Sequence, residues 1–247
     1  MSQVLEANAR MLKGDIAGAV ALYREGARDG DPDCAFNYGY CLARGIGTER
    51  DTAAAKSYFV YAGEMEGEAY YNLAMLYMHG DGVPRNFKRA FSYMVMSAEA
   101  GCIEAQLYLG MAYTTGTVFE PDISFISMIP YHTPVYAAGE ERFLPGTVED
   151  AQREEDERSF VVDADEREAF AWFQTAARHD PTYVAELVAK GKYLYAKCYL
   201  DGFGVGFDRM KAVRLMLAAG RSGSAEAVEY LSSCGITPDR YLDRGRE

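Results

Sequence analysis

Apolar residues recur along the chain at spacings of three, four and seven positions, the pattern of one buried stripe on an amphipathic helix. In each cycle a large residue is followed directly by a small one, and another large residue comes three positions later. The large-small pairs are Tyr38-Gly39, Leu73-Ala74, Leu109-Gly110 and Tyr195-Ala196, and the later residues are Leu42, Tyr77, Tyr113 and Tyr199. The pattern predicts a repeated helix, helix A, whose small residues let a second helix approach closely.

Glycine follows each predicted helix A, at Gly45, Gly80, Gly116 and Gly202. Glycine takes the left-handed conformation that ends a helix without a Cβ clash. A second glycine stands two positions later at 47, 82 and 204, and an N-capping residue follows at Asp51, Asn86 and Asp208. Buried-type alanines then come at 55, 90 and 212. One unit is therefore predicted to be helix A, a Gly-x-Gly loop and a capped helix B.

These columns resemble the SEL-one-like repeat, a relative of the tetratricopeptide repeat. The resemblance is clearest from Ala69-Tyr70-Tyr71-Asn72-Leu73-Ala74 through Gly80-Asp81-Gly82-Val83-Pro84. It implies an all-α, right-handed α/α superhelical repeat solenoid, used by the family in adaptors and scaffolds. Some secreted, cysteine-rich members are described as penicillin-binding or hydrolytic. The five cysteines here, at 34, 41, 102, 198 and 234, lack that branch's recurring pairs and are interpreted as reduced core residues.

The repeat organises the whole chain as one expected solenoid domain, residues 1–247. A divergent helix pair at 3–30 precedes repeats at 31–67, 68–101, 102–180 and 181–223. The last repeat has seven extra residues before its helix A, which we interpret as two added helical turns. A capping helix and polar tail at 224–247 are expected to close the stack, because the terminal face of a solenoid needs a polar cover.

The third repeat carries an insertion at 117–164, between its glycine and the start of helix B. The first half is apolar and aromatic, with prolines that block regular helix. It offers five candidate partner-binding residues: Phe119, Phe125, Ile126, Tyr131 and Tyr136. The alternatives are a partner contact, a homodimer contact, or packing of these residues back into the solenoid groove, which we favour because an exposed apolar patch promotes aggregation.

The second half of the insertion is acidic and includes Glu154-Glu155-Asp156-Glu157. Residues 117–164 contain 11 acidic and three basic side chains, so they carry −8 of the chain's net charge of −12. A solvated acidic segment is the usual meaning of such a run, and docking of a basic partner is the alternative. The overall charge would repel phosphate backbones and anionic lipid, so we expect no nucleic-acid and no membrane partner. The start of the chain lacks a signal-peptide pattern, which favours the cytoplasm.

Solenoids bind along a concave surface, which in the resembling family is lined by A helices. Spacings of three and seven predict a partner-binding stripe of Asn37, Tyr40, Arg44, Asn72, Met75, His79, Tyr108, Met111 and Lys197. The amides of Asn37 and Asn72 suit hydrogen bonding to a peptide backbone, and the basic residues suit a carboxylate. The alternative is that the asparagines only support contacts between repeats.

The sequence shows no clear motif of a metal, phosphate-binding or catalytic site. Histidines 79, 132 and 179 do not cluster with acidic residues, so we expect no metal site and no cofactor. The run Gly202-Phe203-Gly204-Val205-Gly206 resembles a phosphate loop but follows a helix and occupies the repeat's loop position. Neither Gly-x-Ser-x-Gly nor Ser-x-x-Lys occurs. We therefore expect a non-enzymatic adaptor that binds a protein or peptide, with a β-lactam-recognising hydrolase or a homo-oligomeric assembly protein as alternatives.

Overall fold

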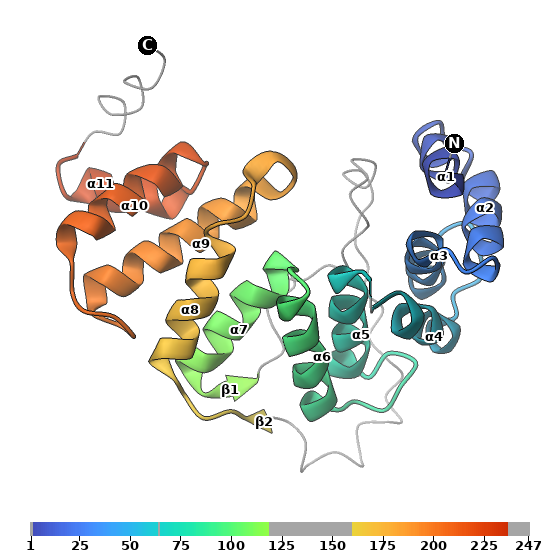
Figure 1. Cartoon of the computed structure of the whole chain (residues 1–247), viewed down its shortest axis with the longest axis horizontal. Helices are drawn as coiled ribbons and strands as arrows, with labels where there is room; N and C mark the ends of the chain where they lie inside the picture. The colour runs from blue at the N-terminus through green and yellow to red at the C-terminus, as the bar shows by residue number, and fades with distance from the viewer. Residues whose placement is uncertain (1, 64, 119–159, 237–247) are drawn as a thin grey trace. The chain divides into compact units, whose positions relative to one another are not determined.

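A computed structural model describes residues 2–63, 65–118 and 160–236, and the described chain is almost entirely helical (Figure 1). It divides into two compact units, which we describe separately. Unit 1 comprises residues 1–102 and 118–160, and unit 2 comprises residues 103–117 and 161–247. The sequence prediction of a single domain over 1–247 stays a prediction.

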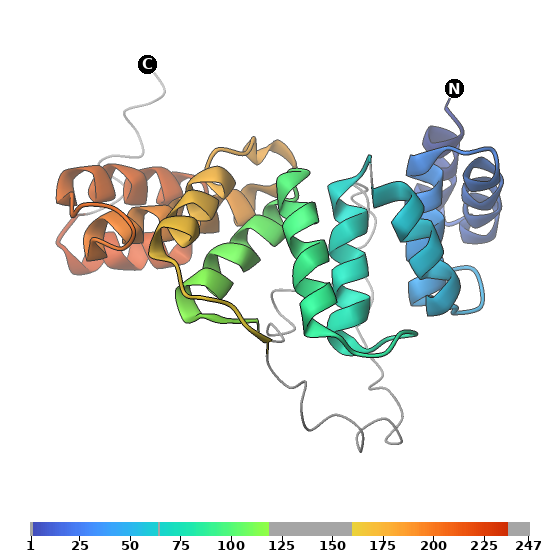
Figure 2. The ribbon, with the colours of Figure 1, turned by 60° about the horizontal axis from the view of Figure 1, so that its bottom comes forward.

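Unit 1 contains six helices within the described residues, and each packs on its neighbours in chain order. The pairs stand side by side, as the teal and green helices of Figure 2 show for α5 and α6. Odd-numbered helices are the A helices and even-numbered ones the B helices. Their bounds are α1 Gln3–Leu12, α2 Ile16–Arg28, α3 Pro32–Arg44, α4 Thr52–Gly63, α5 Gly67–His79 and α6 Phe87–Glu99. The predicted repeat of paired helices is confirmed.

Unit 2 continues the same scheme with α7 Ile103–Thr115, α8 Glu166–Ala176, α9 Pro181–Asp201, α10 Arg209–Arg221 and α11 Ala225–Ser233. Helix α9 has 21 residues where the other full A helices have 13. This is the extension expected from the seven extra residues. The helix is not continuous, however, because Val184 has non-helical angles (φ −137°, ψ 45°) and marks a kink.

The helix ends follow the predicted chemistry. Gly45 and Gly80 end α3 and α5 in the left-handed conformation. The side chains of Asn86 and Asp208 accept hydrogen bonds from the amides of Arg89 (2.8 Å) and Lys211 (2.9 Å), which caps α6 and α10. Asp165 caps α8 by the same means.

The second glycine of each loop lies against the preceding repeat. A Cβ built on Gly82 would stand 2.0 Å from the Thr52 side-chain oxygen, and one on Gly204 would stand 2.0 Å from the backbone oxygen of Glu166. Thr52 and Glu166 begin the helix B of the repeat before. The Gly-x-Gly loop therefore lets one repeat stack closely on the next, and any larger residue at the second position would hold the repeats apart.

The insertion begins and ends at a repeat junction of ordinary geometry. In the other repeats the amide of the capping residue donates to a carbonyl of helix A, as in Asn86 to Tyr77 (2.8 Å) and Asp208 to Tyr199 (3.0 Å). The amide of Asp165 makes the same bond to the carbonyl of Tyr113 (3.1 Å). Two short strands, β1 (Thr117–Val118) and β2 (Phe160–Val161), pair beside this junction. These two strands depart from the all-α fold that the sequence predicts.

Small residues sit where helices A and B approach closely. A Cβ on Gly39 would lie 3.1 Å from the ring of Phe59, and one on Gly110 would lie 2.4 Å from the ring of Phe173. The alanines of helix B are completely buried; they are Ala19, Ala55, Ala90, Ala169 and Ala212. The core of each unit is thus a layer of aromatic and methionine side chains packed against small residues.

Candidate functional site

The predicted A-helix stripe is partly interior. Five of its nine residues are buried: Asn37, Tyr40, Asn72, Met75 and Tyr108. Because Asn72 is fully buried and Met75 and Tyr108 are about 1% exposed, they present no surface to a partner in this structure. The expectation that these five residues lie on an open face is corrected accordingly. Arg44, His79 and Met111 are half-buried and Lys197 is exposed, so a partner contact at these four stays a prediction.

The burial has a local explanation in α5, where every residue from Tyr71 to Met78 is buried. A helix that packs on both α4 and α6 has no free face along most of its length. The amide of Asn37 donates to the carbonyl of Asp33 (2.7 Å) in its own helix, as expected if the asparagine supports the repeat rather than a ligand. The five insertion candidates, Phe119, Phe125, Ile126, Tyr131 and Tyr136, lie outside the described residues.

A second feature of unit 1 is a group of cations around a buried tyrosine, which we call the Tyr77 seam: Lys56, Tyr77, Arg89 and Tyr93. Tyr77, on α5, is 3% exposed and lies between the two B helices α4 and α6. Lys56 of α4 and Arg89 of α6 lie over its ring, with the Nζ and Cζ atoms 5.5 and 5.6 Å from the ring centre. Tyr93 stacks on it with ring centres 5.7 Å apart. Two cations from successive repeats therefore meet at one phenol.

The phenol responds to these charges. Burial by itself raises the pKa of Tyr77, but hydrogen bonds from Lys56 and Arg89 and their positive charges outweigh it, so the pKa falls below its ordinary value. Arg89 donates to the Tyr77 hydroxyl over 3.4 Å. The Tyr77 oxygen is thus an anchor that draws both cations toward one point.

Unit 2 contains the same arrangement with one cation fewer. Tyr199, the equivalent of Tyr77, accepts a hydrogen bond of 2.6 Å from Lys211, whose ammonium lies 4.3 Å from the ring centre. The position of Lys56 is taken by Phe170, which packs on Tyr199 edge to face with ring centres 5.6 Å apart. In the repeat that comes between these two along the chain, the equivalent residues are Tyr113 and Glu168. Burial together with the negative charge of Glu168 raises the pKa of Tyr113.

The recurring contact between a helix A tyrosine and a helix B cation, Tyr77 with Arg89 and Tyr199 with Lys211, was not predicted from the sequence, although a signal was present. Arg89 and Lys211 both stand nine positions after the first glycine of their repeats, in the first turn of helix B. Cations there oppose the helix dipole, which favours acidic residues at an N-terminus. An unfavourable charge that recurs in register indicates a compensating contact, here the tyrosine.

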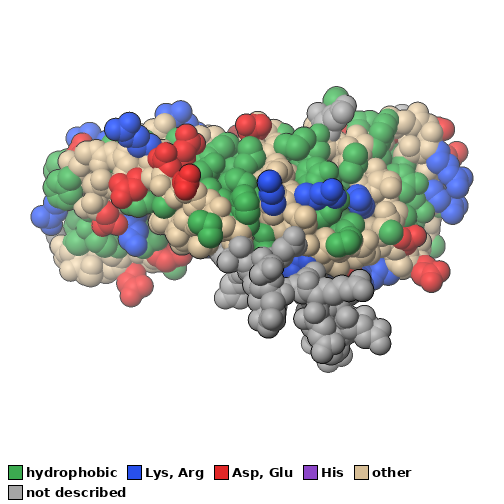
Figure 3. Space-filling model, turned by 90° about the horizontal axis from the view of Figure 1, so that it is seen from below, with side chains coloured by type: hydrophobic (Ala, Val, Ile, Leu, Met, Phe, Trp, Pro, Cys, Tyr) green, Lys and Arg blue, Asp and Glu red, His purple; other side chains and the backbone are tan. Residues whose placement is uncertain are grey.

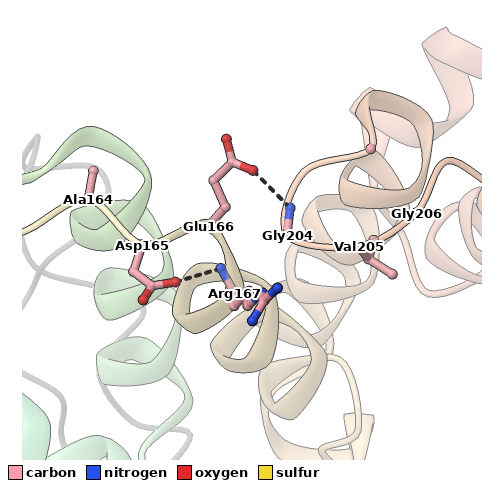
Figure 4. A pocket seen from close by; sticks show the side chains of 8 residues that line it. Ala164, Asp165, Glu166, Arg167, Gly204, Val205 and Gly206 are labelled. Atoms are coloured by element: carbon pink, nitrogen blue, oxygen red, sulfur yellow. Dashed lines mark hydrogen bonds between the residues drawn. The ribbon is translucent and has the colours of Figure 1, made fainter.

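The described residues of unit 2 also form an open hollow of about 780 Å³. Figure 4 shows the start of α8 on one side of it and the Gly202–Gly206 loop on the other. The carboxylate of Glu166 accepts a hydrogen bond from the Gly204 amide over 3.3 Å. A carboxylate of the protein thus occupies the donor that a bound phosphate would use, which agrees with the interpretation of this glycine run as a repeat junction.

The described residues hold no group of three or more His, Cys, Asp or Glu side chains arranged for a metal ion. Burial raises the pKa of the Cys34 and Cys41 thiols to about 12 and that of Cys198 to about 11. These thiols stay protonated at neutral pH and are poor nucleophiles.

Comparison with known families gives a match to the model of the Sel1 repeat at residues 32–66, 67–102, 103–124, 157–181 and 189–224, more than half of the chain. The chain belongs to the Sel1 repeat family. The matched segments leave a gap at 125–156, inside the insertion. No curated protein matches this chain.

Among solved structures, a Sel1 repeat protein from Oxalobacter formigenes is similar over 88% of this chain, with 22% identity and a TM-score of 0.64, and shares the fold. A protective antigen of uropathogenic Escherichia coli, described as displaying an SLR fold, aligns over 94% of this chain with 17% identity and a TM-score of 0.47. This chain spans about half the length of each of these proteins, 49% and 48%.

None of the helices in the described ranges combines the length and the apolar character that a membrane crossing requires. The Sel1 repeats of this chain are instead amphipathic or buried within their own unit.

Proposed function

We propose that this Sel1 repeat protein is a non-enzymatic adaptor that binds a protein or peptide partner. The observation that carries the proposal is the Sel1 repeat over more than half of the chain, since such repeats typically mediate protein interactions. A repeat of helix pairs places side chains at regular intervals along its surface, and this geometry suits an extended partner.

Two surfaces are proposed for the contact. One is formed by the exposed and half-buried members of the A-helix stripe: Arg44, His79, Met111 and Lys197. The other is the insertion 117–164, with its apolar and acidic halves. We keep the cytoplasm as the proposed location, because the buried thiols of Cys34, Cys41 and Cys198 suit a reducing compartment.

The experiment that tests the proposal is affinity capture from native lysate, with bound proteins identified by mass spectrometry. The intact protein is compared with a variant in which residues 117–164 are replaced by Asp-Gly-Val-Pro-Arg, the loop that follows Gly80 in the second full repeat. The replacement restores the usual spacing between Gly116 and Asp165, so the Asp165 to Tyr113 hydrogen bond is expected to be retained.

Loss of a specific partner from the folded replacement variant would assign the contact to the insertion. Retained or stronger capture would assign it to the helices. In the second case Arg44→Ala and His79→Ala are expected to weaken capture, whereas Asn72→Ala is unsuitable as a probe because its side chain is fully buried. A protein that captures no specific partner, or that turns over a substrate without one, contradicts the adaptor role.

A further inference from the structure

The Tyr77 seam of unit 1 contains one more cation than the packing of the two B helices around the tyrosine requires. In unit 2 the equivalent seam is closed by Lys211 alone on one side and by Phe170 on the other. The comparison shows that an apolar ring at the position of Lys56 suffices to pack the two B helices around the tyrosine. The positive charge of Lys56 therefore needs a reason other than the packing of the repeat.

Within the described residues, neither cation of the seam forms an ion pair with a carboxylate. The ion pairs of the described residues include those of Arg10 with Glu6 and Asp15 and that of Arg50 with Asp81. Lys56 and Arg89 instead share the neutral hydroxyl of Tyr77. Two like charges drawn to one point repel each other, and a negatively charged group placed between them would relieve that repulsion. In a chain of net charge −12, this is a local positive site.

The seam is accessible and has apolar neighbours. Arg89 is exposed and Lys56 half-buried. Val60 stands one helical turn after Lys56 on the same face of α4, and Met96 stands two turns after Arg89 on the same face of α6. Val60 is 46% exposed and Met96 40%. In the part of Figure 3 that corresponds to unit 1, Lys and Arg side chains form a row beside hydrophobic ones.

We propose that Lys56 and Arg89 bind the carboxylate side chains of an acidic peptide segment of the partner protein, and that Val60 and Met96 contact an apolar residue next to it. The proposal rests on the proposed adaptor function and names the partner's chemistry. Tyr77 is a positioning residue, because its hydroxyl holds the two cations at one point. Charge-assisted hydrogen bonds to carboxylates are stronger than neutral ones, so the two cations dominate the affinity.

The test selects peptides from a random library displayed on phage, with the intact protein as bait. The bait variant Lys56→Met/Arg89→Met removes the two cations of the seam. The matched control Lys13→Met/Lys88→Met removes two exposed cations outside the seam, so both variants have the same net charge. Circular dichroism verifies that each variant is folded, which is expected because Lys13, Lys88 and Arg89 are exposed and Lys56 is half-buried.

The expected result is enrichment of peptides in which clustered Asp or Glu residues adjoin an apolar residue. These peptides are expected to bind the Lys56→Met/Arg89→Met variant about tenfold or more weakly than the intact protein, and to bind the control variant as tightly as the intact protein. Their affinity for the intact protein is expected to fall with added salt. Tyr77→Phe is expected to weaken the same peptides less, since it removes the anchor and not the charges.

Enriched peptides without acidic residues, or acidic peptides that still bind the Lys56→Met/Arg89→Met variant, would overturn this inference and leave the adaptor role intact. A library that yields no peptide, together with a capture experiment that yields no partner, contradicts both. If the intact protein self-associates in sedimentation and only the seam variant loses this self-association, the seam binds a second copy of the chain and the inference is overturned. If single-stranded DNA binds the seam and peptides do not, the seam binds nucleic acid and the inference is likewise overturned.

Discussion

The carboxyl group of Glu66, which immediately precedes α5, hydrogen-bonds with that of Asp33 in α3. Burial, this hydrogen bond and the negative charges of Asp33 and Glu68 raise the pKa of Glu66 to about 8. At neutral pH the Glu66 carboxyl group therefore keeps its proton, at a junction between α3 and α5 in unit 1. As a result, the stability of that junction depends on pH.

We predict that unit 1 loses stability as the pH rises from about 4.5 to about 8. The folded chain holds the Glu66 proton more tightly than the unfolded chain, whose glutamate has a pKa near 4.5. The stabilisation is fully present below the lower value and is lost above the higher one. Because solvent screens this half-exposed pair, we expect a loss of about 1 kcal/mol. Glu66→Gln should flatten the dependence in urea unfolding followed over that range. Equal slopes in the two proteins would contradict it.

The contact between Gly82 and Thr52 predicts that Gly82→Ala separates two repeats. The substitution adds a Cβ at 2.0 Å from the Thr52 oxygen and forces alanine to φ +69°. Gly14→Ala is the matched control, because Gly14 has φ +81° with no atom within 4 Å of an added Cβ. Backbone strain of about 1 kcal/mol is common to both variants. The Gly82 variant is expected to lose about 2 kcal/mol more in the free energy of unfolding. Equal losses would show that the neighbouring repeat gives way freely.

We predict that the buried hydrogen bond of the Ser97 hydroxyl contributes to the stability of unit 1. Its hydroxyl donates to the carbonyl of Gly67 over 2.8 Å, and Ser97 is fully buried. Ser97→Ala leaves that carbonyl without the bond and should cost about 1–3 kcal/mol in denaturant unfolding. Ser92→Ala removes a similar hydroxyl from the exposed face of the same helix, where it bonds to Lys88, and should be nearly neutral. A neutral Ser97→Ala variant would mean that water replaces the hydroxyl.

Glu168 occupies the position at which Arg89 and Lys211 contact tyrosines in the neighbouring repeats. Glu168→Arg is therefore predicted to lower the pKa of Tyr113, since it replaces a repelling carboxylate by a cation beside the phenol. The measurement is an NMR titration of the tyrosine Cζ resonances, with Tyr113→Phe as the assignment control. Glu168→Gln should give an intermediate pKa. An unchanged Tyr113 resonance would show that the arginine points away from the ring.

The repeat, its caps and its glycines could be predicted from the sequence because each depends on local chemistry in register. Gly80 ends a helix and Asn86 starts the next one whatever lies around them. The exposed face could not be predicted, because helical spacing identifies a stripe but not which neighbour covers it. Asn72 thus lies inside a helix that packs on both sides.

The Tyr77 seam was missed for a related reason. Lys56 reaches Tyr77 from the preceding repeat and Arg89 from the following helix, 21 residues before it and 12 after it. No spacing rule for a single helix connects such positions. The strand pair at 117–118 and 160–161 was also missed, because two-residue strands show no alternation of polar and apolar positions.

The hydrogen bond from Asp165 to Tyr113 has a consequence for how this protein can change. The ends of residues 117–164 are held at the same junction that a short loop spans elsewhere in the chain. The packing of the helices on either side therefore does not depend on the length of the segment inserted between them. New segments can be exchanged at this point without redesign of the repeats, in the way that hypervariable loops are exchanged on a constant framework.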